Sequence, residues 1–222
     1  MLAALLLATP AQPCEVALAL AVDVSGSIDA QEFRLQIDGL AEALRDAAIA
    51  EALVRARAEV MLVQWTGDRR QIVAVPWRKI TDFKAALGFA EAVAAAPREW
   101  RNFSTAIGAA LEFTQAQFAG REHCARRVID VSGDGISNEG IAPASLRGRL
   151  WRDGFTVNGL AIENGDEDLT GYYWENVIVG ENAFVMTADG FADYGRRMKL
   201  KLLREVTDQI SGLAHMRAGG PG

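Results

Sequence analysis

The sequence lacks the features that would indicate a nucleic-acid partner or a membrane span. Lys and Arg number 23 against 29 Asp and Glu, a net charge of −6, and no block of one sign occurs along the 222 residues. A chain without basic clusters has little with which to neutralise phosphates. No apolar run reaches the ~20 residues that a membrane-spanning helix needs. With 50% hydrophobic content and no break in composition, we expect one domain with one large core.

Basic residues are also missing from the start of the chain, where none occurs before Arg34. Residues 2–8 are apolar, and small residues and prolines follow, which resembles a secretory signal cleaved near Ala11. We therefore predict a signal segment at 1–13, a domain at 14–213, a flexible tail at 214–222, and a periplasmic or secreted protein. Since the positive start of such signals is missing, a first strand or helix is the alternative.

Apolar runs and helix-period patterns alternate along the chain. The run 16–22 is apolar throughout and ends in Asp23, which is typical of a strand buried on both faces. A Gly-containing connection between 60–65 and 71–75 predicts a hairpin, and hence one antiparallel edge strand. Further strands are expected at 126–132, 155–162 and 183–187. Helices are expected after a cap at Asp29, at 81–95, after a cap at Ser104, at 143–152, in part of 168–178, and at the end through Ile210.

This alternation predicts an α/β fold with a doubly wound, mostly parallel sheet and helices on both faces. In such sheets, ligands lie beyond the carboxyl ends of the strands, where the strand order reverses. Polar oxygen donors are expected at three such places: Asp23, Ser25 and Ser27 after the first strand, Thr105 at a helix start, and Asp134 after the strand 126–132. Carboxylates and hydroxyls are the hard ligands that Mg²⁺ prefers.

The motif Asp23-Val-Ser25-Gly-Ser27 resembles the Asp-x-Ser-x-Ser signature of von Willebrand factor A-type domains. Their metal-ion-dependent adhesion site (MIDAS) adds a Thr from a second loop and an Asp from a third, and Thr105 and Asp134 match these. The resemblance covers about 14–212 and is nearest to a bacterial family of unknown function. It implies a Rossmann-like fold, a site for Mg²⁺ (or Mn²⁺ or Ca²⁺), and a binding module that engages a carboxylate of a protein or peptide partner. Gly133 and the pair Phe103-Ser104 depart from the family pattern.

Two further features are interpreted with this fold in mind. Asp130 and Asn138 could support the site or form its rim, although a structural acid satisfied by neighbouring backbone is the favoured interpretation of Asp130. Cys14 and Cys124 precede Asp23 and Asp134 by similar distances on strands that are neighbours in the family fold, which predicts a Cys14–Cys124 disulfide. Two free thiols are the alternative. His123 and His215 have no partners at zinc spacing.

Catalysis on the same sheet is the alternative function. A phosphatase of the haloacid-dehalogenase type needs a second Asp where Ser25 stands, and a receiver-type phospho-acceptor needs a Lys where Glu163-Asn164 follows its strand. No Gly-x-x-x-x-Gly-Lys loop occurs. Without a base, a nucleophile pair or a phosphate clamp, the metal alone is a poor catalyst. We therefore expect a binding module rather than a metal-dependent phosphoryl-transfer hydrolase.

Overall fold

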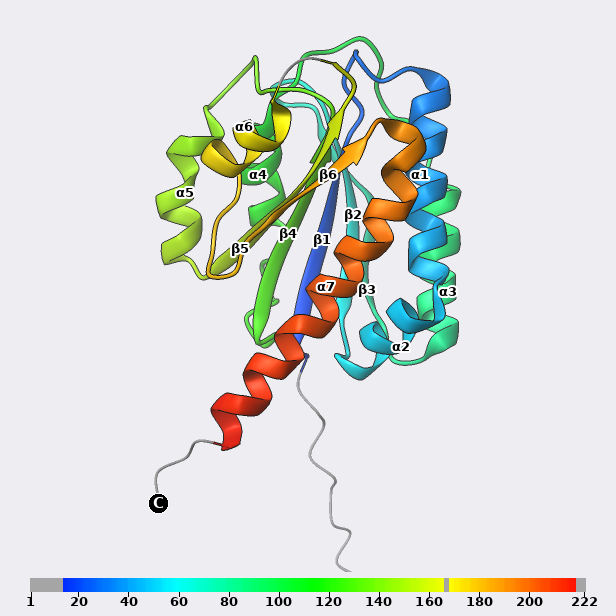
Figure 1. Cartoon of the computed structure of the whole chain (residues 1–222), viewed down its shortest axis with the longest axis vertical. Helices are drawn as coiled ribbons and strands as arrows, with labels where there is room; N and C mark the ends of the chain where they lie inside the picture. The colour runs from blue at the N-terminus through cyan, green and yellow to red at the C-terminus, as the bar shows by residue number, and fades with distance from the viewer. Residues whose placement is uncertain (1–13, 166–167, 219–222) are drawn as a thin grey trace, which may run out of the picture.

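The fold is built on one six-stranded sheet. A computed structural model describes residues 14–165 and 168–218, with the strands in the order β3-β2-β1-β4-β5-β6 (Figure 1). Only the β2–β3 pair is antiparallel; β1 pairs with β2 and β4, and β5 with β4 and β6, in parallel. The strands are β1 Val16–Asp23, β2 Glu59–Trp65, β3 Gln71–Lys79, β4 Arg126–Gly133, β5 Phe155–Glu163 and β6 Val185–Asp189.

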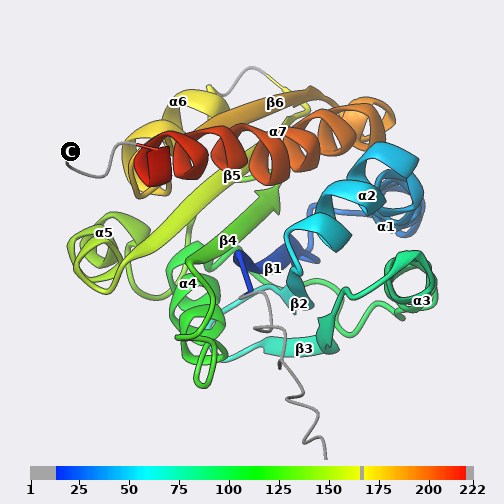
Figure 2. The ribbon, with the colours of Figure 1, turned by 90° about the horizontal axis from the view of Figure 1, so that it is seen from below.

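Helices cover both faces of this sheet. Figure 2, which shows the molecule from below, has α1, α2, α3 and α7 on one side of the sheet and α4, α5 and α6 on the other. The helices are α1 Ala30–Arg45, α2 Ala47–Arg55, α3 Phe83–Ala94, α4 Ile107–Ala116, α5 Pro143–Arg152, α6 Leu169–Asn176 and α7 Phe191–Ala218. The predicted fold class, a doubly wound and mostly parallel sheet with one antiparallel edge strand, is confirmed. No helix among the described residues is both long and apolar enough to cross a bilayer.

The central strand β1 explains how both helical layers are held. Every residue of β1 is buried, and its side chains alternate between two cores. Leu18, Leu20 and Val22 pack in the core beneath α1 and α7, while the intervening alanines pack in the core beneath α4 and α5. A strand that is buried on both faces has no polar alternation, which is why this region is a continuous apolar run in the sequence.

Some local predictions are wrong in detail. Ser104 does not cap α4: the helix begins at Ile107 without a side-chain cap from its own N-cap residue, and the Ile107 N–H donates instead to Ser137 Oγ at 3.1 Å. The helix α2, which Asp46 caps, was missed as a separate element. Helix α7 extends to Ala218, past the start of the predicted tail. The signal segment at 1–13 lies outside the described residues.

A disulfide joins the amino ends of the two central strands. Cys14 and Cys124 are bonded, as predicted, across a sequence separation of 110 residues. They precede β1 and β4, which lie side by side with Val16 opposite Arg126. Backbone hydrogen bonds surround the link, since the Ala125 N–H donates to Cys14 O at 2.9 Å and the Arg126 N–H to Glu15 O at 3.1 Å. The bond therefore lies within an ordered part of the sheet.

Candidate metal centre

Three loops converge at the carboxyl edge of β1 and β4, where the strand order reverses. Ser27 Oγ donates to Asp134 Oδ1 at 2.7 Å across a separation of 107 residues. The Gly26 N–H donates to Phe103 O at 2.8 Å, which joins the first loop to the second. The Asn138 N–H donates to Thr105 O at 2.8 Å, which joins the second loop to the third. The predicted donors therefore come from loops that are bonded to one another.

Asp23 provides the most unusual group at this edge. It is fully buried, and its Oδ1 accepts a hydrogen bond from the Ser25 N–H at 2.7 Å. Its other oxygen, Oδ2, is buried and has no hydrogen-bond partner among the described residues. Burial, and then the nearby charge of Asp134, raise the pKa of Asp23 well above its usual value. Leaving a buried carboxylate oxygen unpaired is costly unless an ion or another group compensates it.

Ser25 and Ser27 link Asp23 with Asp134 through the Ser25 N–H and two hydroxyl groups. Ser25 is fully buried, and its Oγ lies 3.3 Å from Ser27 Oγ, which is exposed and donates to Asp134. Asp134 is half-buried, and burial is the main cause of its raised pKa. Two carboxyl groups thus lie near each other with two hydroxyls between them. This set offers oxygen ligands only, which suits a hard divalent cation.

Gly133 is required by the packing around Asp23. A Cβ atom at position 133 would lie 2.9 Å from Asp23 Oδ2 and 2.8 Å from Tyr173 Oη. Tyr173, from α6, is fully buried, and its hydroxyl also lacks a hydrogen-bond partner among the described residues. Burial, together with the charges of Asp23 and Asp134, raises the pKa of Tyr173. The departure from the family pattern at Gly133 is therefore matched by a tyrosine whose hydroxyl lies close to where a side chain would begin.

The loop that carries Thr105 is held from both sides. The Thr105 N–H donates to Asn138 Oδ1 at 3.0 Å, in addition to the bond that Thr105 O accepts from the Asn138 N–H. Thr105 is 6% exposed, and its Oγ1 lies 3.7 Å from where a Cβ on Gly135 would be. Asn102 takes a left-handed φ of 61°, and the guanidinium of Arg70 lies 3.9 Å from the centre of the Phe103 ring. The Phe103-Ser104 departure therefore leaves a well-supported loop, with Asn138 bonded directly to it.

Sequence reasoning missed two residues that hold the first loop. Arg98 Nη2 donates to Ser25 O at 2.9 Å and to Val24 O at 3.1 Å, and burial lowers the pKa of Arg98. Gln36 Nε2 donates to Asp23 O at 2.9 Å from helix α1. Both act through backbone carbonyls, which every residue has. No motif in the sequence could have identified them.

Asp130 is part of a different structure. Its carboxylate lies 2.5 Å from Lys201 Nζ of α7, which also contacts Glu205 Oε1 of the same helix at 2.7 Å, and all three residues are buried. Asn158 Nδ2 donates to the same Glu205 oxygen at 2.8 Å. Burial, together with the charge of Glu205, raises the pKa of Asp130 to about 7. Asp130 is thus a structural acid, as expected. Its partner is the side chain of Lys201, however, and not the neighbouring backbone that we expected.

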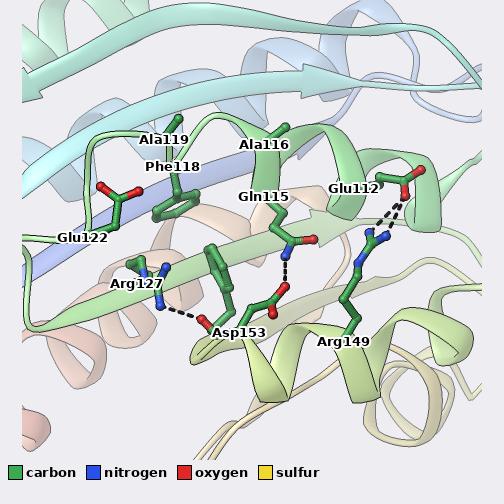
Figure 3. Close-up of a pocket in the computed structure, with 10 residues that line it drawn as sticks. Glu112, Gln115, Ala116, Phe118, Ala119, Glu122, Arg127, Arg149 and Asp153 are labelled. Atoms are coloured by element: carbon green, nitrogen blue, oxygen red, sulfur yellow. Dashed lines mark hydrogen bonds and ion pairs between the residues drawn. The ribbon is translucent and has the colours of Figure 1, made fainter.

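The cavity in Figure 3 differs from the candidate metal centre in that its charged side chains have partners. It has a volume of about 640 Å³ and lies between α4, α5 and the amino ends of β4 and β5. Its polar groups are paired with one another: Arg149 contacts Glu112 at 3.0 Å, and Gln115 Nε2 donates to Asp153 Oδ2 at 2.8 Å. Arg127 Nη2 donates to Asp153 O at 2.5 Å. None of its described lining residues has a buried carboxylate oxygen without a partner, as Asp23 has.

Comparison with known proteins agrees with the fold. The model of a family described as "Protein of unknown function (DUF1194)" matches residues 13–210. No curated protein matches the sequence. Among solved structures, proximal thread matrix protein 1 from the mussel byssus, with a zinc-occupied MIDAS motif, is similar at a TM-score of 0.66 and 16% identity. The alignment covers 87% of this chain and 46% of the mussel protein.

Two other solved structures come from bacteria. The von Willebrand factor type A protein from Catenulispora acidiphila has a TM-score of 0.59 at 17% identity, with 86% of this chain and 43% of its own covered. The pilus adhesin SpaC from Lactobacillus rhamnosus GG has a TM-score of 0.64 at 16% identity, and the alignment covers 92% of this chain and 31% of the adhesin. The chain thus spans less than half the length of each of these three proteins. At such low identity, the structural likeness shows the fold alone, which is of the von Willebrand A type.

Proposed function

The chain belongs to the DUF1194 family of proteins of unknown function, and on that premise we propose that it is an exported binding module that depends on a divalent metal ion. In this proposal the carboxylates and hydroxyls of the three loops hold Mg²⁺, and a carboxylate of a protein partner completes the coordination. The proposed ligands are Asp23, Ser25, Ser27, Thr105 and Asp134.

The unpaired oxygen of Asp23 is the observation that carries this proposal. A fully buried carboxylate oxygen without a hydrogen bond, next to a second acid with a raised pKa, leaves negative charge uncompensated inside the protein. A bound cation would compensate both acids at once. The nearest guanidinium, that of Arg98, already donates to the carbonyls of Val24 and Ser25.

The chemistry of the donors supports a hard cation and an acidic partner. Mg²⁺ takes oxygen ligands in near-octahedral geometry and usually keeps some water. Asp23 has a free oxygen to offer, while Asp134 already accepts a bond from Ser27, so that few negative charges would contact the ion directly. A cation held in this way retains positive charge and an exchangeable position. An external carboxylate is the natural ligand to fill it.

Binding is favoured over catalysis by the side chains that surround Asp23. The residues described at this edge supply no imidazole, ammonium or thiol. The guanidinium of Arg98 holds the backbone of the first loop, and that of Arg70 lies over the Phe103 ring. Phosphoryl transfer would need a cationic clamp for the phosphate in reach of a substrate, in addition to the metal ion. The solved structures of similar fold include an adhesin and a matrix protein, which also favours a binding role.

Export is supported by the disulfide. Disulfides persist in oxidising compartments and are rare in the cytosol of most organisms, and Cys14 and Cys124 are bonded. A periplasmic or secreted location is therefore part of the proposal, together with removal of the segment 1–13.

Titration calorimetry and thermal unfolding test the metal site. We expect Mg²⁺ or Mn²⁺ to bind with one site per chain and to stabilise the fold by about 2.7 kcal/mol at a hundred times the Kd. Asp23→Ala should abolish both effects and keep the fold. Asp38→Ala is the matched control, because Asp38 is an exposed acid on α1 that pairs only with Arg34 among the described residues. Absence of binding at millimolar metal would refute the proposal.

The partner can be sought by pull-down from an envelope extract. Proteins that require the site should be retained in Mg²⁺, released by chelator and absent with the Asp23→Ala variant. Retention that is equal in all three conditions would contradict a metal-dependent partner.

A further inference from the structure

A second group of metal-ligand side chains lies at the opposite end of the sheet. Cys14, Glu59, His123 and Cys124 come from the amino ends of the neighbouring strands β1, β2 and β4, at the lower end of the sheet in Figure 1. One ligand atom from each residue lies within 4.8 Å of all the others. Both sulfurs are bonded to each other, so the group cannot bind a metal in its present form.

We infer that reduction of the Cys14–Cys124 disulfide converts this group into a four-ligand zinc site. The ligands would be two thiolates, His123 Nε2 and Glu59 Oε1, which is the mixture of sulfur, nitrogen and oxygen that Zn²⁺ accepts in proteins. The disulfide would then act as a redox-controlled lock on a metal site. This inference is independent of the Mg²⁺ site at the carboxyl edge.

Two of the required distances are already present. Tetrahedral zinc with bonds of about 2.3 Å to sulfur and about 2.0–2.1 Å to nitrogen or oxygen places sulfur and nitrogen ~3.6 Å apart, and nitrogen and oxygen ~3.3 Å apart. Cys124 Sγ lies 3.7 Å from His123 Nε2, and that nitrogen lies 3.0 Å from Glu59 Oε1. The two sulfurs have to move apart after reduction, to about 3.8 Å, and the remaining ligand atoms already lie within 4.8 Å of one another.

The charges around the group also match a bound zinc ion. Zn²⁺ with two thiolates and one carboxylate carries a net charge of −1. Arg121 Nε lies 2.7 Å from Glu59 Oε2, and Lys79 Nζ lies 3.6 Å from Glu59 Oε1. Arg121 therefore orients the carboxylate by its far oxygen, as the outer-shell partners of metal ligands commonly do, and both cations balance the excess negative charge.

Backbone hydrogen bonds hold both cysteines independently of the S–S bond. The Ala125 N–H donates to Cys14 O at 2.9 Å, and the Cys124 N–H donates to Arg121 O at 3.1 Å. Cys14 and Cys124 are 7% and 5% exposed, but the side chain of His123 is 49% exposed. Zinc can thus reach the site at the histidine edge, while the thiolates stay protected from bulk water.

The zinc site would form in two steps, reduction of the disulfide and then binding of the metal ion. A dithiol reductant gives two electrons and two protons to the S–S bond and leaves as its own disulfide, which produces two protein thiols. Zn²⁺ then replaces the two thiol protons, which are released to solvent, and binds the neutral imidazole and the ionised carboxylate.

Zinc titration of oxidised and reduced protein tests the inference. The Asp23→Ala background removes the other proposed metal site, and a phosphine serves as the reductant because its oxide does not compete for zinc. We expect the reduced protein to bind one zinc ion at least a hundredfold more tightly than the oxidised protein. Co²⁺ should give a thiolate-to-metal charge-transfer band in the reduced form only. Equal zinc affinity in both forms would overturn the inference.

Single substitutions distinguish a folded site from zinc captured by loose thiols. His123→Ala and Glu59→Gln should each weaken zinc binding at least tenfold in reduced protein. His215→Ala, the only other histidine in the sequence, is the matched control and should leave the affinity unchanged. Circular dichroism must show native secondary structure in the zinc-bound reduced protein. A reduced protein that is unfolded with zinc present, or one insensitive to His123→Ala, would contradict the inference.

Discussion

Two buried acids at opposite ends of the central strands are compensated differently. Glu59 begins β2, is 2% exposed, and contacts Arg121, Lys79 and His123. Asp23 ends β1, is fully buried, and has one oxygen with no hydrogen-bond partner among the described residues. Cationic side chains form ion pairs with the first acid, whereas no ion pair with the second occurs among the described residues.

The third buried acid, Asp130, follows the pattern of Glu59. It lies in β4, one strand away from Asp23, and Lys201 reaches it from α7. In both cases a cation of the chain contacts the buried acid. The exception occurs at the switch point of the sheet, where ligands of open α/β folds bind. This contrast supports the proposal that an external cation binds at Asp23, since Glu59 and Asp130 each contact a cation of the chain.

Removing Lys201 should have the largest effect on stability, because it would turn a compensated acid into an uncompensated one. Lys201→Ala leaves Asp130 and Glu205 buried without their cation, and we expect a loss of ~3–5 kcal/mol of unfolding free energy at neutral pH, measured by urea denaturation. Lys199→Ala is the control, since Lys199 pairs with Asp46 at the surface with 52% of its side chain exposed, and should cost ~1 kcal/mol or less. Equal effects of both substitutions would contradict the comparison.

Filling the space at Gly133 should disturb the uncompensated acid itself. A methyl group in Gly133→Ala would meet Asp23 Oδ2 and Tyr173 Oη at distances below 3.0 Å. We expect a loss of about 1–3 kcal/mol in stability and at least a tenfold weaker Mg²⁺ affinity. Gly148→Ala is the matched control, because a Cβ at this position in α5 meets no atom within 4 Å, and should stabilise the protein by up to ~1 kcal/mol. Unchanged Mg²⁺ binding in Gly133→Ala would place the ion away from Asp23.

The sheet could be predicted because its signals are local. Continuous apolar runs such as residues 16–22, and the capping pair Asp29 and Glu32, come from packing and hydrogen bonds that act over a few residues. The Cys14–Cys124 bond followed from counting residues along neighbouring strands of a family fold. The N-cap role of Ser137 toward α4 could not be predicted, because it depends on a loop that is distant in sequence.

The same limit applies to the candidate site. Its proposed ligands carry a motif, but Arg98 and Gln36 contact backbone carbonyls and Tyr173 approaches from α6, so that only the folded chain brings them together. The interpretation of Asp130 identified a structural acid but not its partner, since a lysine buried in the middle of an amphipathic helix is indistinguishable in sequence from a solvated one. Long-range charge pairs of this kind carry no local pattern.

The smallest expected effect concerns pH. The contributions of Asp193 and Asp23 to the stability of the fold should change with pH in opposite directions. Arg197 and Arg196 lower the pKa of Asp193 to about 2, so its contribution to stability is present above pH ~4 and is lost as the pH falls toward 2. Asp193→Asn should therefore cost about 0.5–1 kcal/mol at pH 7 and nothing near pH 2.

Asp23 should behave in the opposite sense in metal-free protein. Its pKa is raised in the fold, so the folded state binds more protons than the unfolded state above the ordinary carboxyl value of 3.8, and stability decreases as the pH rises from there. Asp23→Asn should remove this slope in urea denaturation with a chelator present, and saturating Mg²⁺ should remove it in the unmodified protein, because the ion takes the place of the proton. If Asp23→Asn changed stability equally at every pH, Asp23 would be compensated within the chain, as Glu59 is, and the need for an external cation would disappear.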